Sequence, residues 1–120
     1  LQYKVAGAEM FDRSQLMKGT LEGCILLIIG RETTYGYEIM EKLIQYGFAG
    51  IREGTIYPLL VRLEKKHLIA SEYRISPLGP SRKYYHLTDS GRETAEEFSA
   101  AWQDISQAVE RILGRGEGNV

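Results

Sequence analysis

The sequence contains very few of the residues that build disulfide frameworks and metal clusters. Its 120 residues include one cysteine, Cys24, and two histidines. A single cysteine excludes both a disulfide within the chain and a zinc site built from several thiolates. We therefore predict no metal site, and we expect the reducing environment of the cytoplasm.

Long apolar runs are also missing. The longest one, from Cys24 to Ile29, has six residues, whereas a transmembrane helix needs about 20. No signal-peptide pattern precedes this run. We expect a soluble cytoplasmic protein without a membrane partner.

Catalytic motifs are absent as well. His67 and His86 do not show the helical spacing of paired zinc ligands, no Ser, Cys or Lys stands in a nucleophile motif, and no glycine-rich phosphate loop occurs. The sequence therefore predicts no catalytic residue, no cofactor and no enzymatic activity.

The net charge of the chain is small, but the charged residues are unevenly distributed along it. The formal net charge is −1, which by itself argues against a nucleic-acid partner. Residues 1–51 carry 5 Lys/Arg and 6 Asp/Glu, residues 52–92 carry 8 and 4, and residues 93–120 carry 2 and 6, so the local balances are −1, +4 and −4. A basic middle between acidic flanks is typical of a protein that turns one face toward phosphate.

The basic middle contains a two-faced helix between residues 54 and 68. Because successive residues of a helix are rotated by 100°, four apolar residues fall in a stripe on one side of it. They are Ile56, Leu59, Leu60 and Leu63. The proline favours a start near Gly54 or Thr55, with Pro58 in the first turn. The other face suits DNA: we predict base-edge contacts from Thr55 and Tyr57 beside Pro58, and phosphate contacts from Arg62 and Lys65. The alternative is an ordinary core helix with a solvated back.

Two helices and a hairpin surround this element. Periodicity predicts a helix from about residue 15 that Gly30 ends, and a second from residue 35 or 36 to 46, capped by Thr33 or Thr34. The short link 48–53 makes the second and third helices a helix-turn-helix. Alternation over 69–75 and 81–87 predicts a β-hairpin wing, in which Arg82 and Lys83 hold phosphates or, alternatively, only protect a sheet edge.

The last predicted helix follows Thr88 and Asp89 and carries a heptad seam. Its apolar residues recur at spacings of 3 and 4 and are Ala95, Phe98, Trp102, Ile105, Val109 and Ile112. We predict that this seam forms a homodimer interface, with Leu26 of the first helix contributing. The alternative is that the seam packs on the first helix of its own chain.

The ordered set of these segments resembles the PadR family of transcriptional regulators. The strings that carry the resemblance are GTLE from residue 19, YGYEI from 35, EGTIYPLL from 53, RLEK from 62, RKYY from 82, and Leu87, Thr88 and Gly91. They cover about residues 16–113. The resemblance implies a winged-helix domain, a dimerisation helix and repression of nearby genes. Some compact members sandwich planar drugs at a tryptophan in a similar place, which implies an effector site at Trp102 with Phe98 beside it; the alternative is that Trp102 only fills the interface.

Together these observations predict a mainly α (α+β) winged helix-turn-helix with a two-stranded wing and a long C-terminal dimerisation helix. The predicted divisions are an arm at 1–14, a DNA-binding domain at 15–87, the dimerisation helix at 88–113 and a flexible tail at 114–120. The predicted function is a dimeric regulator that binds a pseudo-palindromic duplex, with a planar aromatic molecule as effector. The alternative is a winged-helix module for protein contacts within a larger assembly.

Overall fold

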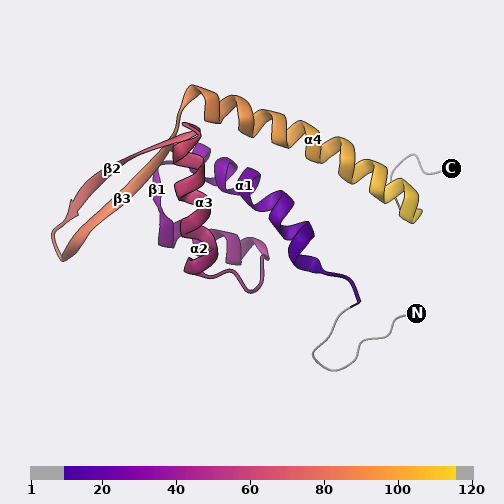
Figure 1. Cartoon of the computed structure of the whole chain (residues 1–120), viewed down its shortest axis with the longest axis horizontal. Helices are drawn as coiled ribbons and strands as arrows, with labels where there is room; N and C mark the ends of the chain where they lie inside the picture. The colour runs from indigo at the N-terminus through magenta and orange to yellow at the C-terminus, as the bar shows by residue number, and fades with distance from the viewer. Residues whose placement is uncertain (1–9, 116–120) are drawn as a thin grey trace.

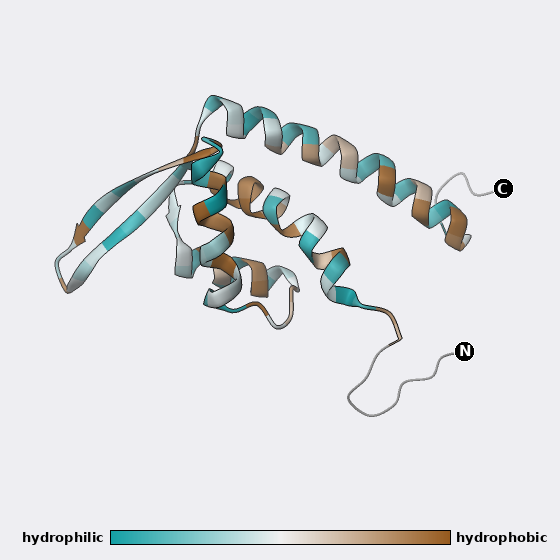
Figure 2. Ribbon diagram, in the orientation of Figure 1, coloured by the Kyte–Doolittle hydropathy of each residue, from teal (hydrophilic) through white to brown (hydrophobic). Residues whose placement is uncertain are grey.

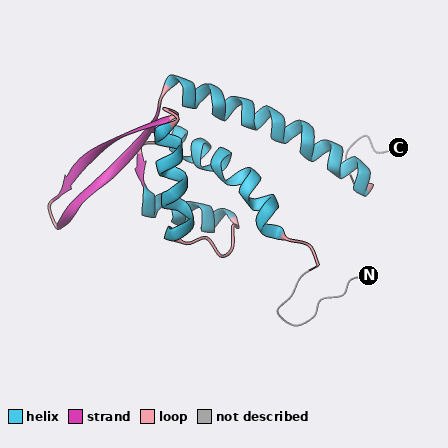
Figure 3. Ribbon diagram, viewed as in Figure 1, coloured by secondary structure: helices cyan, strands magenta, loops and turns pink. Residues whose placement is uncertain are grey.

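The computed structural model describes residues 10–115, which form four helices and a three-stranded antiparallel sheet (Figures 1 and 3). In chain order the elements are α1 (Arg13–Arg31), β1 (Thr34–Tyr35), α2 (Gly36–Tyr46), α3 (Glu53–Lys65), β2 (Ile69–Ser76), β3 (Gly79–Leu87) and α4 (Asp89–Leu113). This confirms the predicted mainly helical winged helix-turn-helix with a long last helix. Most of the predicted arm and tail lies outside the described residues.

Helix α1 occupies the centre of the fold and packs against α2, β3 and α4. Its buried side chains include Leu21, Ile25, Ile28 and Ile29. Leu26 is also buried, at 2% exposure, so the prediction that it contributes to a dimer interface is wrong, because its surface is already used in the core of its own chain. The helix also continues one residue past Gly30, and Leu87 packs against that glycine.

The sheet has the order β1-β3-β2. Strands β2 and β3 form the predicted wing, and Figure 1 shows their hairpin projecting away from the helices. Strand β1 was not predicted, and Thr34 lies in it opposite Tyr85 instead of capping α2. The Thr34 hydroxyl donates to the Glu38 carboxylate, and Tyr35 is the N-cap without a side-chain bond. A two-residue strand is too short to leave a periodic signal in the sequence.

Helix α3 buries the predicted stripe through Ile56, Leu60 and Leu63. It begins earlier than predicted, at Glu53, so Pro58 lies in the second turn and not in the first. Because proline has no amide proton, it cannot bond to the carbonyl of Gly54 four residues back, as a helical residue otherwise would. Pro58 is exposed, so its ring stands on the outer face of the helix.

The junction between the wing and α4 is tightly packed. Thr88 caps α4 by accepting from the Gly91 amide at 3.0 Å, and its hydroxyl donates to the His67 carbonyl at 2.7 Å. A Cβ on Gly91 would lie 1.9 Å from the carbonyl oxygen of Leu68. The direction in which α4 leaves the domain is therefore fixed by backbone contact at its first turn. Along residues 10–115, no helix combines the length and the apolar character that crossing a bilayer requires.

We predict that Gly91→Ala destabilises the fold by about 1–3 kcal/mol or more, because the added methyl group must displace the backbone of Leu68 or tilt α4. Urea unfolding of the purified protein measures this. Gly19→Ala is the matched control, since Gly19 lies within α1 with nothing near its Cβ position and should gain up to about 1 kcal/mol. Equal unfolding midpoints for the two variants would contradict this account of the junction.

Candidate nucleic-acid interface

The outer face of α3 is open along its length. Thr55, Pro58, Arg62 and Lys65 are exposed, and Tyr57 is 42% exposed. The tyrosine ring lies against the start of α2, where a Cβ on Gly36 would be 2.7 Å from it. Thr55 and Tyr57, the predicted base-contacting residues, are therefore both accessible to solvent, and Tyr57 is held in place against α2.

Tyrosines surround a hollow of about 340 Å³ between α3, the start of α2 and the wing. Its lining residues are Tyr35, Gly36, Tyr37, Tyr57, Tyr73, Ser81, Arg82, Lys83 and Tyr85. The outer face of α3 and the basic part of β3 thus form one continuous surface. Phenolic hydroxyl groups and cations are the side-chain groups that bond phosphate oxygens.

Lys83 joins the wing to α3. Its ammonium lies 3.0 Å from the Glu64 carboxylate, which also accepts from the Ser71 hydroxyl at 2.5 Å. The Ser71 bond and the lysine lower the pKa of Glu64, and the bond to Glu64 raises the pKa of Lys83. Both groups therefore stay charged at neutral pH, and Lys83 already has an anionic partner within the protein.

Arg62 joins α3 to α1 in a similar way. Its Nε donates to the Glu22 carboxylate at 2.7 Å, its Nη2 contacts the same carboxylate, and the Lys66 ammonium lies 3.9 Å away. Arg62 and Lys83, both predicted as phosphate contacts, are thus neutralised by carboxylates of their own chain.

Lys65 and Arg82 differ from these two cations. Neither forms an ion pair with any residue between 10 and 115. Lys65 is exposed on α3, and the Arg82 guanidinium lies 4.6 Å from the centre of the Tyr35 ring. These two predicted contacts are therefore available to an external anion without breaking an ion pair.

The heptad seam of α4 divides into two parts. Ala95 is buried, and the Phe98 ring lies over Gly23 of α1, where any side chain would collide with it. The packing on the first helix that we considered as an alternative therefore applies to this part. The second part remains exposed and comprises Trp102, Ile105, Val109 and Ile112. Figure 2 shows that apolar residues recur along α4 to its end, where the helix has diverged from α1.

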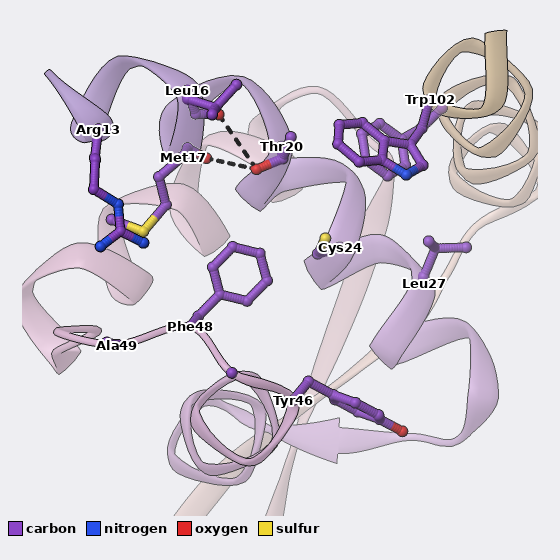
Figure 4. Close-up of a pocket in the computed structure, with 12 residues that line it drawn as sticks. Arg13, Leu16, Met17, Thr20, Cys24, Leu27, Tyr46, Phe48, Ala49 and Trp102 are labelled. Atoms are coloured by element: carbon purple, nitrogen blue, oxygen red, sulfur yellow. Dashed lines mark hydrogen bonds between the residues drawn. The ribbon is translucent and has the colours of Figure 1, made fainter. Parts of the chain in front are cut away.

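A cavity of about 660 Å³ lies between α1, the segment after α2, and α4 (Figure 4). Trp102, 48% exposed, and Phe98 both line it. The other lining residues are Arg13, Leu16, Met17, Thr20, Cys24, Leu27, Tyr46, Gly47, Phe48 and Ala49. Burial raises the pKa of the Cys24 thiol, so the thiol remains neutral. Among the described residues that line the cavity, Arg13 alone is charged. The volume is within the range of small-molecule sites.

Sequence reasoning did not find the contribution of α1 and of the segment after α2 to this cavity. Phe48 offered one signal, since it is a large apolar residue directly after Gly47, the left-handed C-cap of α2. Met17, Thr20 and Cys24 follow one another at helical spacing on α1. That this face of α1 lines a cavity becomes evident only from the position of α4.

Comparison with known proteins agrees with this geometry. The family model described as the transcriptional regulator PadR-like family matches residues 25–97. The crystal structure of a PadR-like transcriptional regulator from Bacillus cereus is 51% identical, covers 86% of this chain and 99% of its own, and superimposes with a TM-score of 0.77. A transcriptional regulator of Mycobacterium tuberculosis is 32% identical over 75 residues, which are 62% of this chain and 68% of that protein.

A second relative, an uncharacterized protein of Lysinibacillus sphaericus, is 32% identical over 84% of this chain and 94% of its own. The matching family and the similar structures are regulators and not enzymes, which confirms the prediction of no enzymatic activity. With the winged helix-turn-helix described above, these matches establish that the chain belongs to the PadR-like family of transcriptional regulators.

Proposed function

We propose that the chain acts as a homodimer that binds a pseudo-palindromic DNA duplex, represses transcription and releases the DNA when a planar aromatic molecule binds beside Trp102. The observation that carries the proposal is the separation of two exposed surfaces. One is the α3 face with the wing, where Lys65 and Arg82 have no ion pair within residues 10–115. The other is the apolar stripe at the end of α4.

The first surface suits DNA. An α3 helix lying in a major groove presents Thr55 and Tyr57 to base edges, while cations at its end and on the wing meet phosphates. A two-fold dimer places two such helices about 34–36 Å apart, one turn of the duplex. The decisive experiment is selection of bound duplexes from the DNA upstream of the gene, followed by footprinting. Two protected half-sites are expected, whereas failure to retain any duplex would favour a module for protein contacts.

We predict a dimer held by the exposed part of the α4 stripe, because an apolar row of this kind is covered in a stable protein. Sedimentation at micromolar concentration should show one species near twice 13.6 kDa. Val109→Glu should shift it to a monomer by placing a charge in the apolar seam. Gln107→Glu adds the same charge to an exposed position outside the seam and should remain dimeric. A wild-type monomer would exclude the dimer and the two-half-site geometry.

We predict that Lys65→Ala lowers the slope of log affinity against log salt by about 0.9 per protomer, the value for one lost phosphate contact. Lys83→Ala should lower it less, because Glu64 already neutralises that lysine. Titrations of a labelled duplex across a salt series give both slopes. Lys18→Ala removes a charge from α1 and serves as the control. A salt-independent affinity of the wild type would contradict phosphate contact by the basic middle.

We predict that planar aromatic dyes quench Trp102, the sole tryptophan, at micromolar concentration by stacking in the cavity. Because Arg13 contributes a positive charge to the lining, anionic and cationic dyes of equal ring size should be compared. Calorimetry should show that binding is lost in Trp102→Ala and retained in Trp102→Phe. Equal binding by Trp102→Ala would place the effector elsewhere.

A further inference from the structure

The tip of the wing presents apolar side chains that nothing in the described part of the chain covers. Ile75 is 87% exposed and Leu78 is 99% exposed, and Pro77 and Pro80 stand beside them. Two prolines limit the backbone freedom of so short a turn. The tip is thus a stiff apolar point at the end of an extended hairpin, and exposed apolar groups of this kind mark contact sites.

Positive charge directly behind the tip indicates what kind of partner the tip meets. Residues 72–83 contain three cations, Arg74, Arg82 and Lys83, and one carboxylate, Glu72, which lies 3.7 Å from the Arg74 guanidinium. Arg74 and Arg82 are directly paired across β2 and β3, so both guanidinium groups stand on the same face of the hairpin. Like charges at paired positions repel each other. Glu72 offsets part of this repulsion, whereas Arg82 has no ion pair within residues 10–115. The charge of Arg82 favours a polyanion over an apolar protein surface.

Stacking keeps the two arginines near the hairpin. The Arg74 guanidinium lies 4.5 Å from the centre of the Tyr84 ring, and the Arg82 guanidinium lies 4.6 Å from the centre of the Tyr35 ring. Both cations are therefore oriented before a partner arrives, one on each strand. This arrangement suits two phosphate groups on opposite sides of a narrow groove.

The length and anchoring of the wing are compatible with a groove next to the one occupied by α3. The Lys83 to Glu64 ion pair fixes the middle of the hairpin to α3, since Lys83 is paired with Tyr73 of β2. The eight residues of β2 extend about 26 Å at 3.3 Å per residue. Half a turn of duplex, which separates a major groove from the adjacent minor groove, is about 17 Å. The minor groove is about 6 Å wide, so it admits a hairpin tip but not a helix.

We propose that Leu78, at the wing tip, wedges against a base step in the minor groove beside the major groove occupied by α3 and so bends the duplex. Ile75 covers the adjoining sugars, and Arg74 and Arg82 hold the phosphates on either side. Apolar side chains that unstack a step in this way bend the DNA toward the major groove. This proposal rests on the DNA-binding function proposed above and adds to it a deformation of the DNA.

The proposal gives the wing a role in sequence preference. Pyrimidine–purine steps unstack and bend most easily. The preferred duplex should therefore carry a TA or CA step at a position that α3 does not reach. The sequence of this step is selected through the cost of deforming it and not through a hydrogen bond to a base.

The test uses the full-length protein and a duplex that the wild type selects from a random-sequence pool. A single 2-aminopurine is moved through the base pairs that flank each half-site, since its fluorescence rises when it is unstacked. The wild type should raise the fluorescence at one flanking step per half-site. Leu78→Ser should abolish the rise and weaken binding roughly ten-fold, with an unchanged salt slope because no charge is lost. Arg82→Ala should retain the rise and lower the slope.

Ile44→Ser is the matched control, because Ile44 is an exposed apolar residue on α2 outside both surfaces, and it should bind like the wild type. A half-site footprint without any 2-aminopurine response overturns the wedge while the DNA-binding function stands. Loss of affinity in Leu78→Ser without a wild-type response also overturns it, since the tip then meets only the sugar–phosphate backbone. Failure of the pool to yield any bound duplex defeats the proposed function itself.

Discussion

Burial of α1 is the interaction on which the rest of the structure depends. Leu21, Ile25 and Ile29 are almost completely buried, and the helix packs against α2, β3 and α4 at the same time. Because each of these elements contacts α1, their relative positions all depend on this one packed helix. Cores are packed as densely as organic crystals, so a displacement of α1 has to move the helix-turn-helix or α4.

Two ion pairs add to the buried apolar stripe in holding α3 within this frame. Glu22 of α1 holds Arg62, and Glu64 of α3 holds Lys83 of the wing. Exposed ion pairs contribute little to stability, but each of these two joins α3 to a different neighbour and so restricts its rotation. They also neutralise two cations, Arg62 and Lys83, so the positive charge that attracts DNA is smaller than the count of lysines and arginines indicates. A phosphate that meets Arg62 must compete with Glu22.

The sequence predicts those elements whose apolar residues recur with a regular period over many positions. The stripe of α3, the alternation of the wing and the seam of α4 each span two or more turns or several strand residues, and all three elements form as predicted. Strand β1 has two residues, and its pairing with β3 is a contact across the chain that no local pattern carries. The burial of Leu26 and the cavity beside Trp102 also depend on how helices are placed relative to one another. The seam of α4 shows what a sequence pattern cannot predict. One continuous heptad pattern includes Phe98, which packs on α1, and Ile112, which is exposed to solvent.

Helix α1 both lines the cavity and contacts α3, so it connects the two. Met17, Thr20 and Cys24 line the cavity from one side of α1, while Glu22, placed between them in the sequence, reaches Arg62 of α3. A guest in the cavity releases DNA only if it binds more tightly to an arrangement that DNA disfavours. An α1 helix moved by the guest would carry Glu22 with it and so change the position of α3, whereas a guest accommodated by Trp102 alone would leave α3 in place. An effector that acts through α1 should therefore change the distance between Glu22 and Arg62, whereas one that acts through α4 alone should change only the spacing of the two α3 helices in the proposed dimer.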